Sequence, residues 1–455
     1  MTGASSPSPS PRVPEPRPWR RSAAWLALLG PLFFATYGFA NWVAGRRAEV
    51  GVVAFDWERS IPFLAWTIVP YWTIDALYGL SLFLCATRAQ VDVLAKRLLL
   101  AQAICIACFL AFPLRFSFER PETGGAFGWM FDVLMGFDKP FNQAPSLHVA
   151  LLVILWLVYL RHTTTRWHWL VHGWFALIGV SVLTTYQHHF IDIPTGMLAG
   201  WLCAWLVPDA GRSPLRGAAL SSDPQRRRLA GRYATGAAAA AALGLGISGW
   251  ALWLLWVAVS LAMVAAIYAF LDERAFQKSA QGSLSPATRW LLAPYLAGAW
   301  LNSRWWTRAR PLPDAVLPGL LIGRLPTRAE REAQGIRAVV DMSAELPCAA
   351  VGVRYASVPQ LDLTLPSAAQ LERAVRAIEA AMASGPVLVC CALGFSRSAA
   401  AVAAWLVATG RAAATADAVE QVRRARPAVV LAPELVEAVD RFARRTREGG
   451  AAPWR

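Results

Sequence analysis

The chain has 455 residues, a formal net charge of +15 and a hydrophobic fraction of 56%. Charged residues make up only 16% of it, against roughly a quarter in soluble globular proteins. The length predicts about three domains. The shortage of charge predicts that part of the chain is embedded in lipid, and it argues against a disordered, fibrous or purely water-soluble protein. The basic residues are nearly all arginine, because Lys96, Lys139 and Lys278 are the only lysines.

The N-terminal half is dominated by apolar runs. They follow a basic, Ser- and Pro-rich segment at residues 1–22, for which we expect a disordered cytoplasmic tail. The runs expected to span a membrane are 23–44, 64–86, 98–114, 146–160, 168–186, 190–207, 234–250 and 251–271. A span needs about 20 residues, so 146–160 is short, and 234–271 is either one long segment or a tight helical pair. The prediction is about eight spans, six of them firm. The first run is too long for a signal-peptide core and is expected to be an uncleaved anchor.

The placement of positive charge predicts the orientation of these spans. With a cytoplasmic N-terminus, the loops that face the cytoplasm carry Arg88, Lys96, Arg97, Arg161, Arg166 and the arginines between residues 212 and 232. This agrees with the positive-inside rule. We therefore expect a multi-pass protein of the plasma membrane with both termini in the cytoplasm. Because the basic residues mark loops and form no stripe, nucleic acid is not an expected partner.

Composition also predicts how the chain is divided. The expected segments are a membrane domain at 23–207, a basic cytoplasmic linker at 208–233, two further spans at 234–271, a segment of alternating bulky apolar and basic residues at 272–310, an α/β domain at 311–447 and a tail at 448–455. The alternating segment favours a helix in the membrane interface, or equally a linker helix packed on the following domain. The fold class is thus a multi-pass α-helical membrane domain followed by a cytoplasmic α/β domain.

The α/β domain is predicted from alternating short β-rich and Ala-rich runs. The expected strands are Ala338–Met342, Gly352–Val358 and Pro386–Cys390, and the expected helices are 368–383, 397–409, 415–425 and 433–447. Such alternation predicts parallel strands with helices on both faces of the sheet.

Two histidines in the membrane half are candidates for chemistry. His148 begins one span and His188 precedes another, and the two spans between them return both to the same non-cytoplasmic face, where Arg115 and Arg120 also lie. Ionisable residues at membrane depth are costly and therefore functional candidates. The alternative is interfacial histidines that contact only headgroups and water.

These residue types suit phosphate chemistry. Arginine binds phosphate oxygens bidentately. One imidazole can attack phosphorus while Asp192, four residues after His188, fixes its tautomer. The other imidazole can protonate the departing oxygen.

Three segments here, Arg115–Pro121, Pro145–His148 and Gln187–Asp192, resemble the signatures of the type-2 phosphatidic-acid phosphatase superfamily, and most of all its inositolphosphotransferase-like branch. The resemblance covers about residues 60–207. It implies the following roles: His188 as nucleophile, Asp192 as its orienting partner, His148 as general acid, Arg115 and Arg120 as phosphate ligands, and Ser146 in an assisting role.

Two positions depart from those signatures, and one neighbour competes with the nucleophile. Pro113 stands where a lysine is expected, which makes Arg115 the candidate replacement, and Val182 stands where an arginine is expected. If no other cation replaces them, the membrane half is weak or inactive. His189 is a rival nucleophile, although only His188 has the spacing to Asp192 that the signature requires.

A second constellation lies near the C-terminus, in Val387–Ser398. A strand ends at Cys391, a loop of five residues contains Gly394, and Arg397 and Ser398 open an Ala-rich helix. Such a loop can place its backbone N–H groups around phosphate oxygens at a helix N-terminus. That environment favours a thiolate, and the arginine can bind two oxygens. The alternative is a structural strand–helix turn. The domain has no histidine, which excludes a Cys–His protease.

This loop resembles the dual-specificity (cysteine-based) protein phosphatases across about residues 311–447, and Arg423–Pro427 looks like that family as well. The resemblance implies Cys391 as the nucleophile that forms a phosphocysteine, Arg397 as phosphate binder, and Ser398 assisting thiolate departure. It also implies an acidic residue upstream as general acid. Asp362, 29 residues before Cys391, is the chosen candidate, and Asp341 is expected to be structural.

Cys390 stands where that family usually has histidine, and it has either a packing role or a redox role with Cys391. Three functional hypotheses remain open: a phosphatase with two sites on opposite membrane faces, a phosphotransferase at His188, and a cysteine phosphatase whose membrane half only senses or anchors. The expected substrates are a membrane lipid phosphate outside, and a phosphoprotein or phosphorylated lipid headgroup in the cytoplasm. Neither site is expected to need a metal or a cofactor.

Overall fold

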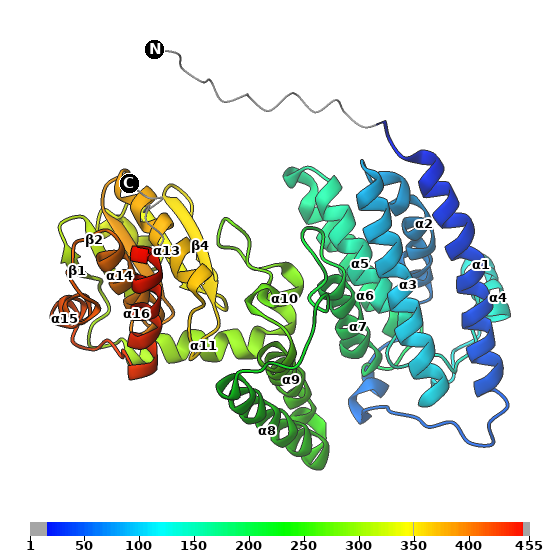
Figure 1. Cartoon of the computed structure of the whole chain (residues 1–455). Coiled ribbons are helices and arrows are strands. Elements are labelled where there is room, and N and C mark those ends of the chain that lie inside the picture. The colour runs from blue at the N-terminus through cyan, green and yellow to red at the C-terminus, as the bar shows by residue number, and fades with distance from the viewer. Residues whose placement is uncertain (1–15, 349, 449–455) are drawn as a thin grey trace. The chain divides into compact units, whose positions relative to one another are not determined.

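The computed structural model describes residues 16–348 and 350–448 (Figure 1). The chain divides into two compact units, residues 1–213 and 214–455. Each is described by itself.

The first unit is helical. Its helices are α1 (Trp19–Ala44), α2 (Ile68–Leu84), α3 (Arg88–Ala111), α4 (Gly125–Phe137), α5 (Leu147–His162), α6 (His168–Thr184) and α7 (Asp192–Leu206). Each of the six apolar runs predicted up to residue 207 lies in one helix, and α4 lies where a loop was expected. Buried apolar side chains of α1, α2, α3, α5, α6 and α7 form one shared core.

Five helical segments among the described residues are long and apolar enough to cross a membrane: Trp19–Ala44, Ala65–Leu84, Arg88–Ala111, Thr165–Thr184 and Gly249–Phe270. Helices α5 and α7 have 16 and 15 residues, which is short against the roughly 20 that a span needs.

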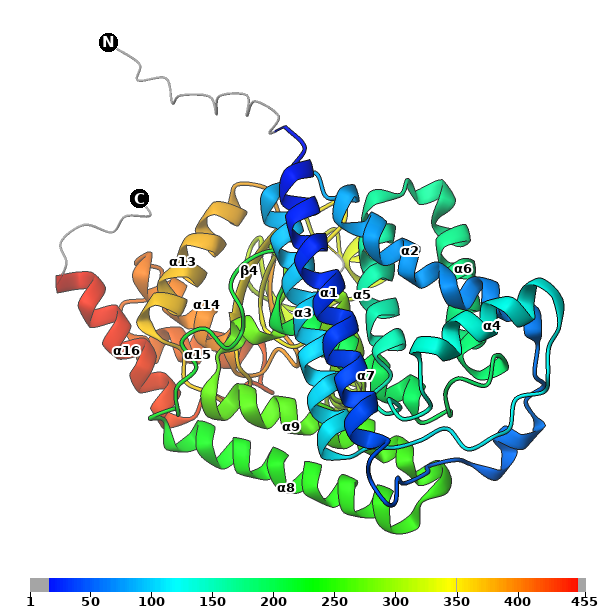
Figure 2. The ribbon, with the colours of Figure 1, turned by 90° about the vertical axis from the view of Figure 1, so that its right-hand side faces the viewer.

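The second unit begins with a helical hairpin. Helices α8 (Pro224–Ile247) and α9 (Leu254–Phe270) lie side by side (Figure 2), joined by a short 3₁₀ turn at Gly249–Trp253. The segment at 234–271 is therefore a tight pair rather than one long helix. Next come α10 (Pro286–Leu291) and α11 (Ala293–Trp306). The break between them precedes Pro294, which has no N–H to donate and suits the first turn of a new helix.

The α/β part follows. It contains β1 (Asp314–Leu317), β2 (Leu320–Arg324), α12 (Arg328–Ala333), β3 (Ala338–Ser343), β4 (Arg354–Gln360), α13 (Ala368–Met382), β5 (Val387–Cys391), α14 (Arg397–Ala408), α15 (Thr415–Ala425) and α16 (Pro433–Glu448). In the described part of the chain these strands form one five-stranded sheet in the order β1-β2-β5-β3-β4.

The sheet corrects the expectation of parallel strands throughout. β2, β5, β3 and β4 are parallel, but β1 pairs antiparallel with β2, which makes the sheet mixed. A two-residue turn, Pro318–Gly319, joins them, and Gly319 has φ +81°. A Pro-Gly pair is a strong turn signal, because proline presets φ and glycine accepts positive φ.

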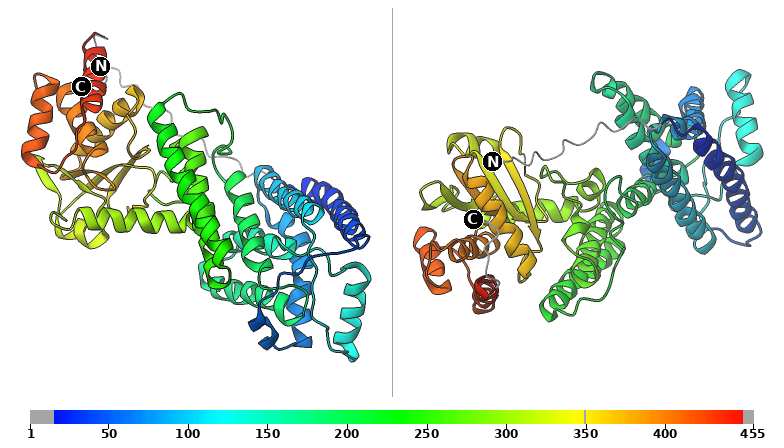
Figure 3. Two further views of the ribbon diagram at one scale, coloured as in Figure 1. Left: turned by 90° about the horizontal axis from the view of Figure 1, so that it is seen from below. Right: turned by 45° about the horizontal axis from the view of Figure 1, so that its top comes forward.

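The two faces of the sheet are covered differently. Apolar side chains of α13, α14, α15 and α16 pack into the larger core on one face. On the other face a smaller core includes Cys390, with Ala299 of α11 packed against it. Figure 3 (left) shows the sheet between α11 and the orange-to-red C-terminal helices. We predicted helices on both faces of the sheet. On the face with the smaller core, α11 and adjoining loops provide the cover, so the prediction holds there only in part.

Candidate active sites

The carboxyl ends of three parallel strands meet at one edge of the sheet and bring polar residues together there. β3 ends just before Glu345, β4 just before Asp362, and β5 at Cys391. Parallel strands deliver their C-terminal residues to one edge, where ligands of α/β sheets commonly bind. Sequence reasoning missed Glu345; the one available signal was an acidic residue shortly after a predicted strand, which does not by itself identify a contact with Arg397.

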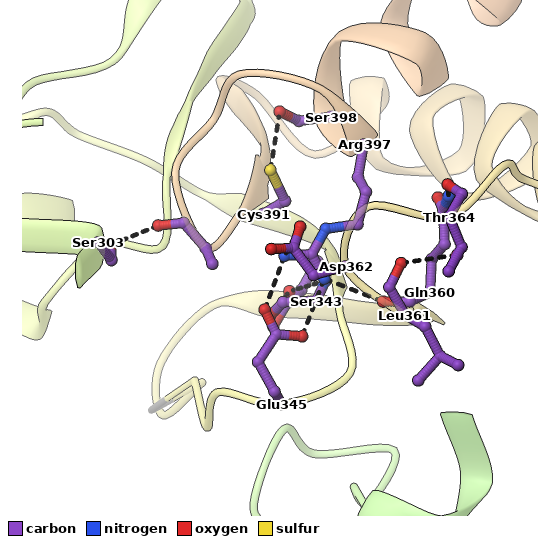
Figure 4. A network of polar contacts seen from close by, with 12 residues as sticks. Ser303, Ser343, Glu345, Gln360, Leu361, Asp362, Thr364, Cys391, Arg397 and Ser398 are labelled. Carbon is purple, nitrogen blue, oxygen red and sulfur yellow. Dashed lines mark hydrogen bonds and ion pairs between the residues drawn. The ribbon is translucent and has the colours of Figure 1, made fainter. Parts of the chain in front are cut away.

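Cys391 lies at the base of a tight loop between β5 and α14 (Figure 4). The side chain is only 2% exposed. Its sulfur accepts a hydrogen bond from the Gly394 backbone N–H at 3.2 Å and lies 3.5 Å from Ser398 Oγ. Both donors can stabilise negative charge on sulfur. The structure thus brings together the cysteine, glycine and serine singled out in the sequence.

Gly394 is required by sterics as well as by conformation. It has φ +74°, and a Cβ at this position would lie 2.2 Å from the Gly323 carbonyl carbon in β2. The loop therefore rests directly on the neighbouring strand, which leaves no room for any side chain.

We expect Gly394→Ala to disrupt this loop and to lower the stability of the domain. The positive φ alone costs roughly 1–2 kcal/mol for an L-residue, and the clash with backbone atoms adds to that cost. Thermal unfolding of the variant, followed beside Gly385→Ala, checks this expectation. Gly385 also has positive φ (+110°), but its Cβ would meet only the Arg337 side chain, at 3.2 Å. The loop contact is irrelevant if both variants unfold at the same temperature.

Arg397 is held in place by carboxylates before any substrate binds. Its Nη1 and Nη2 donate to the two oxygens of Glu345 at 2.8 and 2.6 Å, and Nη1 also donates to the Gln360 carbonyl at 2.9 Å. Asp362 Oδ1 lies 3.1 Å from Nη2. Both Arg397 and Glu345 are buried. A bidentate pair of this kind fixes the plane of the guanidinium.

The pKa values of the two carboxyl groups beside Arg397, those of Glu345 and Asp362, are shifted in opposite directions. Burial alone raises the pKa of Glu345, but the charge of Arg397 and its hydrogen bonds outweigh burial and leave that pKa lowered. Burial raises the pKa of Asp362, where Arg397 opposes the shift and Glu345 reinforces it. Neighbouring groups with pKa values pushed apart are typical of an acid and its ionised partner. Asp362 is the carboxyl that can hold a proton.

Asp341, the rival acid, belongs to a separate buried network. It accepts hydrogen bonds from Lys278 Nζ at 2.6 Å and Tyr355 Oη at 2.9 Å, and from the Ser343 backbone N–H and hydroxyl at 2.8 Å each. Lys278 and Asp341 are both buried, so their pair is shielded from water. This arrangement ties together the ends of β3 and β4 and fits the structural role expected of Asp341.

Cys390 and Cys391 point to opposite faces of the sheet, as successive strand residues do. Cys390 packs in the smaller core and Cys391 in the larger one. Burial raises the pKa of the Cys390 thiol, which keeps it protonated. The geometry favours packing over a redox role with its neighbour.

In the first unit, residues at the starts of α5 and α7 meet. His188 Nδ1 lies 2.9 Å from Asp192 Oδ2, and Nε2 lies 3.2 Å from Ser146 Oγ. All three are buried. The Ser146 hydroxyl also accepts the Val149 N–H and so caps α5. The predicted pairing of His188 with Asp192 is present in the geometry, and Ser146 extends it.

Two glycines in α7 allow this meeting. A Cβ at Gly196 would lie 2.7 Å from the Ser146 carbonyl oxygen, and one at Gly200 would lie 2.7 Å from the Ala150 carbonyl oxygen. Small residues four apart permit close helix contact. The close contact between α5 and α7, which places Ser146 beside His188, therefore depends on these two glycines.

The other candidate residues of this unit are His148, Arg120 and Arg115. The His148 ring stacks on Tyr71 at 4.2 Å, and its buried Nε2 has no hydrogen-bond partner among the described residues. Arg120 donates to the backbone carbonyls of Thr185 and Tyr186, both at 3.1 Å, so it braces the turn before His188. Arg115 is exposed. In the described residues no hydrogen bond joins the side chains of His148 or Arg115 to His188.

His189, the rival nucleophile, has its own partners. Its Nδ1 lies 2.9 Å from Glu58 Oε2, and its Nε2 lies 3.0 Å from Ser117 Oγ. Phe116 stacks on the ring at 4.5 Å. These contacts join three loops, which is typical of a structural histidine. Sequence reasoning missed Glu58, since it lies far from every motif.

Part of the second unit is similar to known proteins. Residues 324–445 match the family described as dual specificity phosphatase, catalytic domain. Among similar solved structures are PTPMT1 in complex with PI(5)P, at 22% identity, covering 30% of this chain and 99% of that chain with a TM-score of 0.28, and Tk-PTP in the active form, at 29% identity, 30% and 99% coverage and a TM-score of 0.28. Human DUSP28 matches at 28% identity, 30% and 96% coverage and a TM-score of 0.28. Residues 324–445 of this chain are a dual-specificity phosphatase catalytic domain.

Proposed function

We propose that this chain is a membrane-bound phosphoric monoester hydrolase that works through a phosphocysteine on Cys391. The observation that carries the proposal is the loop in which Cys391 Sγ, the Gly394 N–H and Ser398 Oγ converge while α14 presents Arg397. The expected substrates are phosphotyrosine, phosphoserine or phosphothreonine, or a phosphorylated lipid headgroup.

The proposed reaction uses two displacements at phosphorus. The Cys391 thiolate attacks phosphorus, the bond from phosphorus to the leaving oxygen breaks, and Asp362 gives its proton to that oxygen. Water then attacks the phosphocysteine, Asp362 takes a proton from this water, and the sulfur–phosphorus bond breaks to release inorganic phosphate. Arg397 binds two phosphate oxygens, and Ser398 donates a hydrogen bond to the departing sulfur.

Trapping the intermediate tests this proposal. The full-length protein is mixed with a phosphotyrosine peptide, quenched rapidly and mapped by mass spectrometry. We expect phosphate on the peptide that contains Cys391, and none there in the Cys391→Ala variant. Phosphate turnover without an adduct at Cys391 would contradict the mechanism.

Asp362→Asn is expected to lower kcat/KM by about a hundredfold, because general acid catalysis typically contributes 10²–10⁴. The pH profile gives the sharper test. The pKa of Asp362 is raised, so it keeps its proton to a higher pH than an ordinary aspartate, and activity falls as pH rises through that pKa. The asparagine variant has no such proton to lose, and its profile should lack this alkaline fall. An unchanged profile would assign the acid elsewhere.

For the first unit we propose a lipid-phosphate phosphatase or phosphotransferase that works through a phosphohistidine, on the outer face of the inner membrane. The buried Ser146–His188–Asp192 arrangement supports it, because Asp192 can orient one imidazole nitrogen and the other is turned to a hydroxyl. The alternative, a membrane half that only senses or anchors, gains weight from the missing cations at Pro113 and Val182.

His188→Ala separates these alternatives. In a Cys391→Ser background, which silences the second site, and in vesicles that contain phosphatidic acid, the protein with an intact first site releases phosphate or exchanges headgroups, and adding His188→Ala should lower that activity at least about a hundredfold. His168→Ala, a change at the other end of the helical region, is the matched control. If the Cys391→Ser protein with an intact His188 neither releases phosphate nor exchanges headgroups, the first unit is an anchor.

A further inference from the structure

A pocket of about 280 Å³ adjoins the cysteine loop inside the second unit. One end is formed by Glu345, Asp362, Ala392 and Leu393, which belong to the active site or touch it. The remaining lining comes from residues that precede the phosphatase domain in the sequence, namely Tyr233 of α8, Val257 and Leu261 of α9, and Pro294, Tyr295, Gly298, Ala299 and Asn302 of α11. The hairpin and α11 thus form walls of a pocket that is also lined by Asp362 and by the two residues that follow Cys391.

The same elements also hold the catalytic segments. Tyr268 of α9 donates its hydroxyl to the Asp362 backbone carbonyl at 3.0 Å. The Ser303 hydroxyl of α11 donates to the Ala392 carbonyl, directly after the nucleophile (Figure 4). Both tyrosine and serine are buried. The hairpin and α11 are therefore part of the active site.

The outer surfaces of these helices are strongly apolar. At the far end of the hairpin, Ile247 is 68% exposed and Trp250 82% exposed. Along α11, Trp300, Leu301, Trp305 and Trp306 are exposed as well, and Arg304 and Arg308 stack over two of these tryptophans. Exposed apolar side chains gathered on one element and accompanied by arginine indicate a membrane contact, and tryptophan is enriched where a bilayer meets water. Helix α9 itself lies in one of the segments apolar enough to cross a membrane.

The chemistry of the pocket wall favours a lipid over a protein chain. A bound peptide needs partners for its backbone N–H and C=O groups. Apart from the catalytic carboxyl groups, the lining offers apolar side chains such as Val257, Leu261 and Pro294 and a few polar groups, those of Tyr233, Tyr295 and Asn302. These few polar groups suit a small headgroup better than an extended peptide backbone. At about 280 Å³ the pocket is at the small end for ligand sites. It can hold a glycerol-sized headgroup, while acyl chains stay outside against apolar helix surface.

We infer that the pocket between the α8–α9 hairpin, α11 and the cysteine loop binds a phospholipid that ends in a phosphomonoester. The phosphate enters the Cys391 loop, the headgroup lies along Tyr233 and Tyr295, and the acyl chains remain in the bilayer beside α9. This inference rests on the proposed function of Cys391 and names the substrate class of that site.

The test uses the full chain in phosphatidylcholine vesicles with dioleoyl phosphatidic acid as probe. His188→Ala is the background, so that the first unit releases no phosphate. The soluble comparison is a phosphotyrosine peptide, and Cys391→Ser is assayed with both. We expect kcat/KM for the lipid to exceed that for the peptide by at least about tenfold, a difference of about 1.4 kcal/mol, and both activities to vanish in Cys391→Ser.

Leu261→Asn tests the pocket wall, with Leu243→Asn as matched control. Leu243 is an exposed leucine of α8 outside the pocket lining. A polar side chain at Leu261 should lower the lipid-to-peptide ratio of kcat/KM about tenfold, since it replaces an apolar contact with an unpartnered amide, and the control should keep the ratio. Hydrolysis of the peptide but not of the lipid, or an unchanged ratio in Leu261→Asn, overturns the inference and leaves the proposed function intact. If neither substrate is hydrolysed, the proposed function itself fails.

Discussion

Replacing Cys391 with serine is expected to abolish phosphate release at the cysteine site, with a loss of about four orders of magnitude in kcat. Serine is close in size, so the loop can keep its shape, and the Gly394 N–H can still donate to the new oxygen. A hydroxyl, however, is un-ionised at neutral pH, and the α/β domain contains no histidine that could act as its general base. Four orders of magnitude correspond to about 5.4 kcal/mol of transition-state stabilisation.

Steady-state assays with the phosphotyrosine peptide measure this loss. Cys390→Ala is the matched control, since Cys390 is the adjacent residue but faces the opposite core. The control should turn over peptide within about threefold of the wild-type protein, although it removes a buried sulfur and should unfold at a lower temperature. If Cys391→Ser keeps its turnover, the nucleophile lies elsewhere, and the loop is a structural turn.

The cysteine loop could be predicted from the sequence because its chemistry is local. Cys391, Gly394, Arg397 and Ser398 lie within eight consecutive residues, so the strand–loop–helix order alone places them together. Asp362 was found through its distance from the nucleophile. Its position beside Arg397 follows from the parallel sheet, which brings the ends of β4 and β5 to the same edge.

Contacts between distant segments could not be predicted in this way. Glu345 lies 52 residues before Arg397, and no periodic pattern marks it. Ser303 and Tyr268 belong to segments whose apolar composition predicts a membrane role and conceals their contacts with the catalytic loops. Such pairings are set by tertiary packing, which composition and periodicity do not encode.

The strand and helix predictions missed three short elements of the α/β part, although the equally short β5 was predicted. β1 and β2 have four and five residues, and α12 has six. Patterns of this length carry little information on periodicity, and only the Pro318–Gly319 turn signalled the hairpin. The long apolar helices were located well, because a run of about 20 apolar residues is hard to mistake. Whether they cross a membrane is a separate question, which topology mapping at residue 130 would answer.

Arg397→Lys is expected to lower kcat/KM for the phosphotyrosine peptide by about 10²–10³, the usual cost of removing one preorganised donor from a developing anion. Lysine keeps the positive charge but loses the planar fork that binds two oxygens at once. The same fork now bonds to both oxygens of Glu345 and to the Gln360 carbonyl, and a single ammonium cannot satisfy all of them. The loss should therefore appear mainly in kcat, because the misplaced charge still attracts the phosphate but no longer matches the transition state.

Arg376→Lys provides the control, because Arg376 is an exposed arginine of α13 that pairs with Glu372 on the same helix. It should leave kcat and KM unchanged, since an exposed ion pair contributes roughly 0–1 kcal/mol to stability and lies outside the site.

Glu345→Gln separates positioning from charge: it removes the negative partner of Arg397 but keeps a hydrogen-bond acceptor. We expect a smaller loss than for Arg397→Lys, together with a shift of the alkaline limb of the pH profile to lower pH, because Glu345 helps to raise the pKa of Asp362. Retention of kcat in Arg397→Lys within tenfold would mean that the fork does not bind the transferring phosphoryl group, and the phosphate-binding role would pass to the backbone N–H groups of the loop.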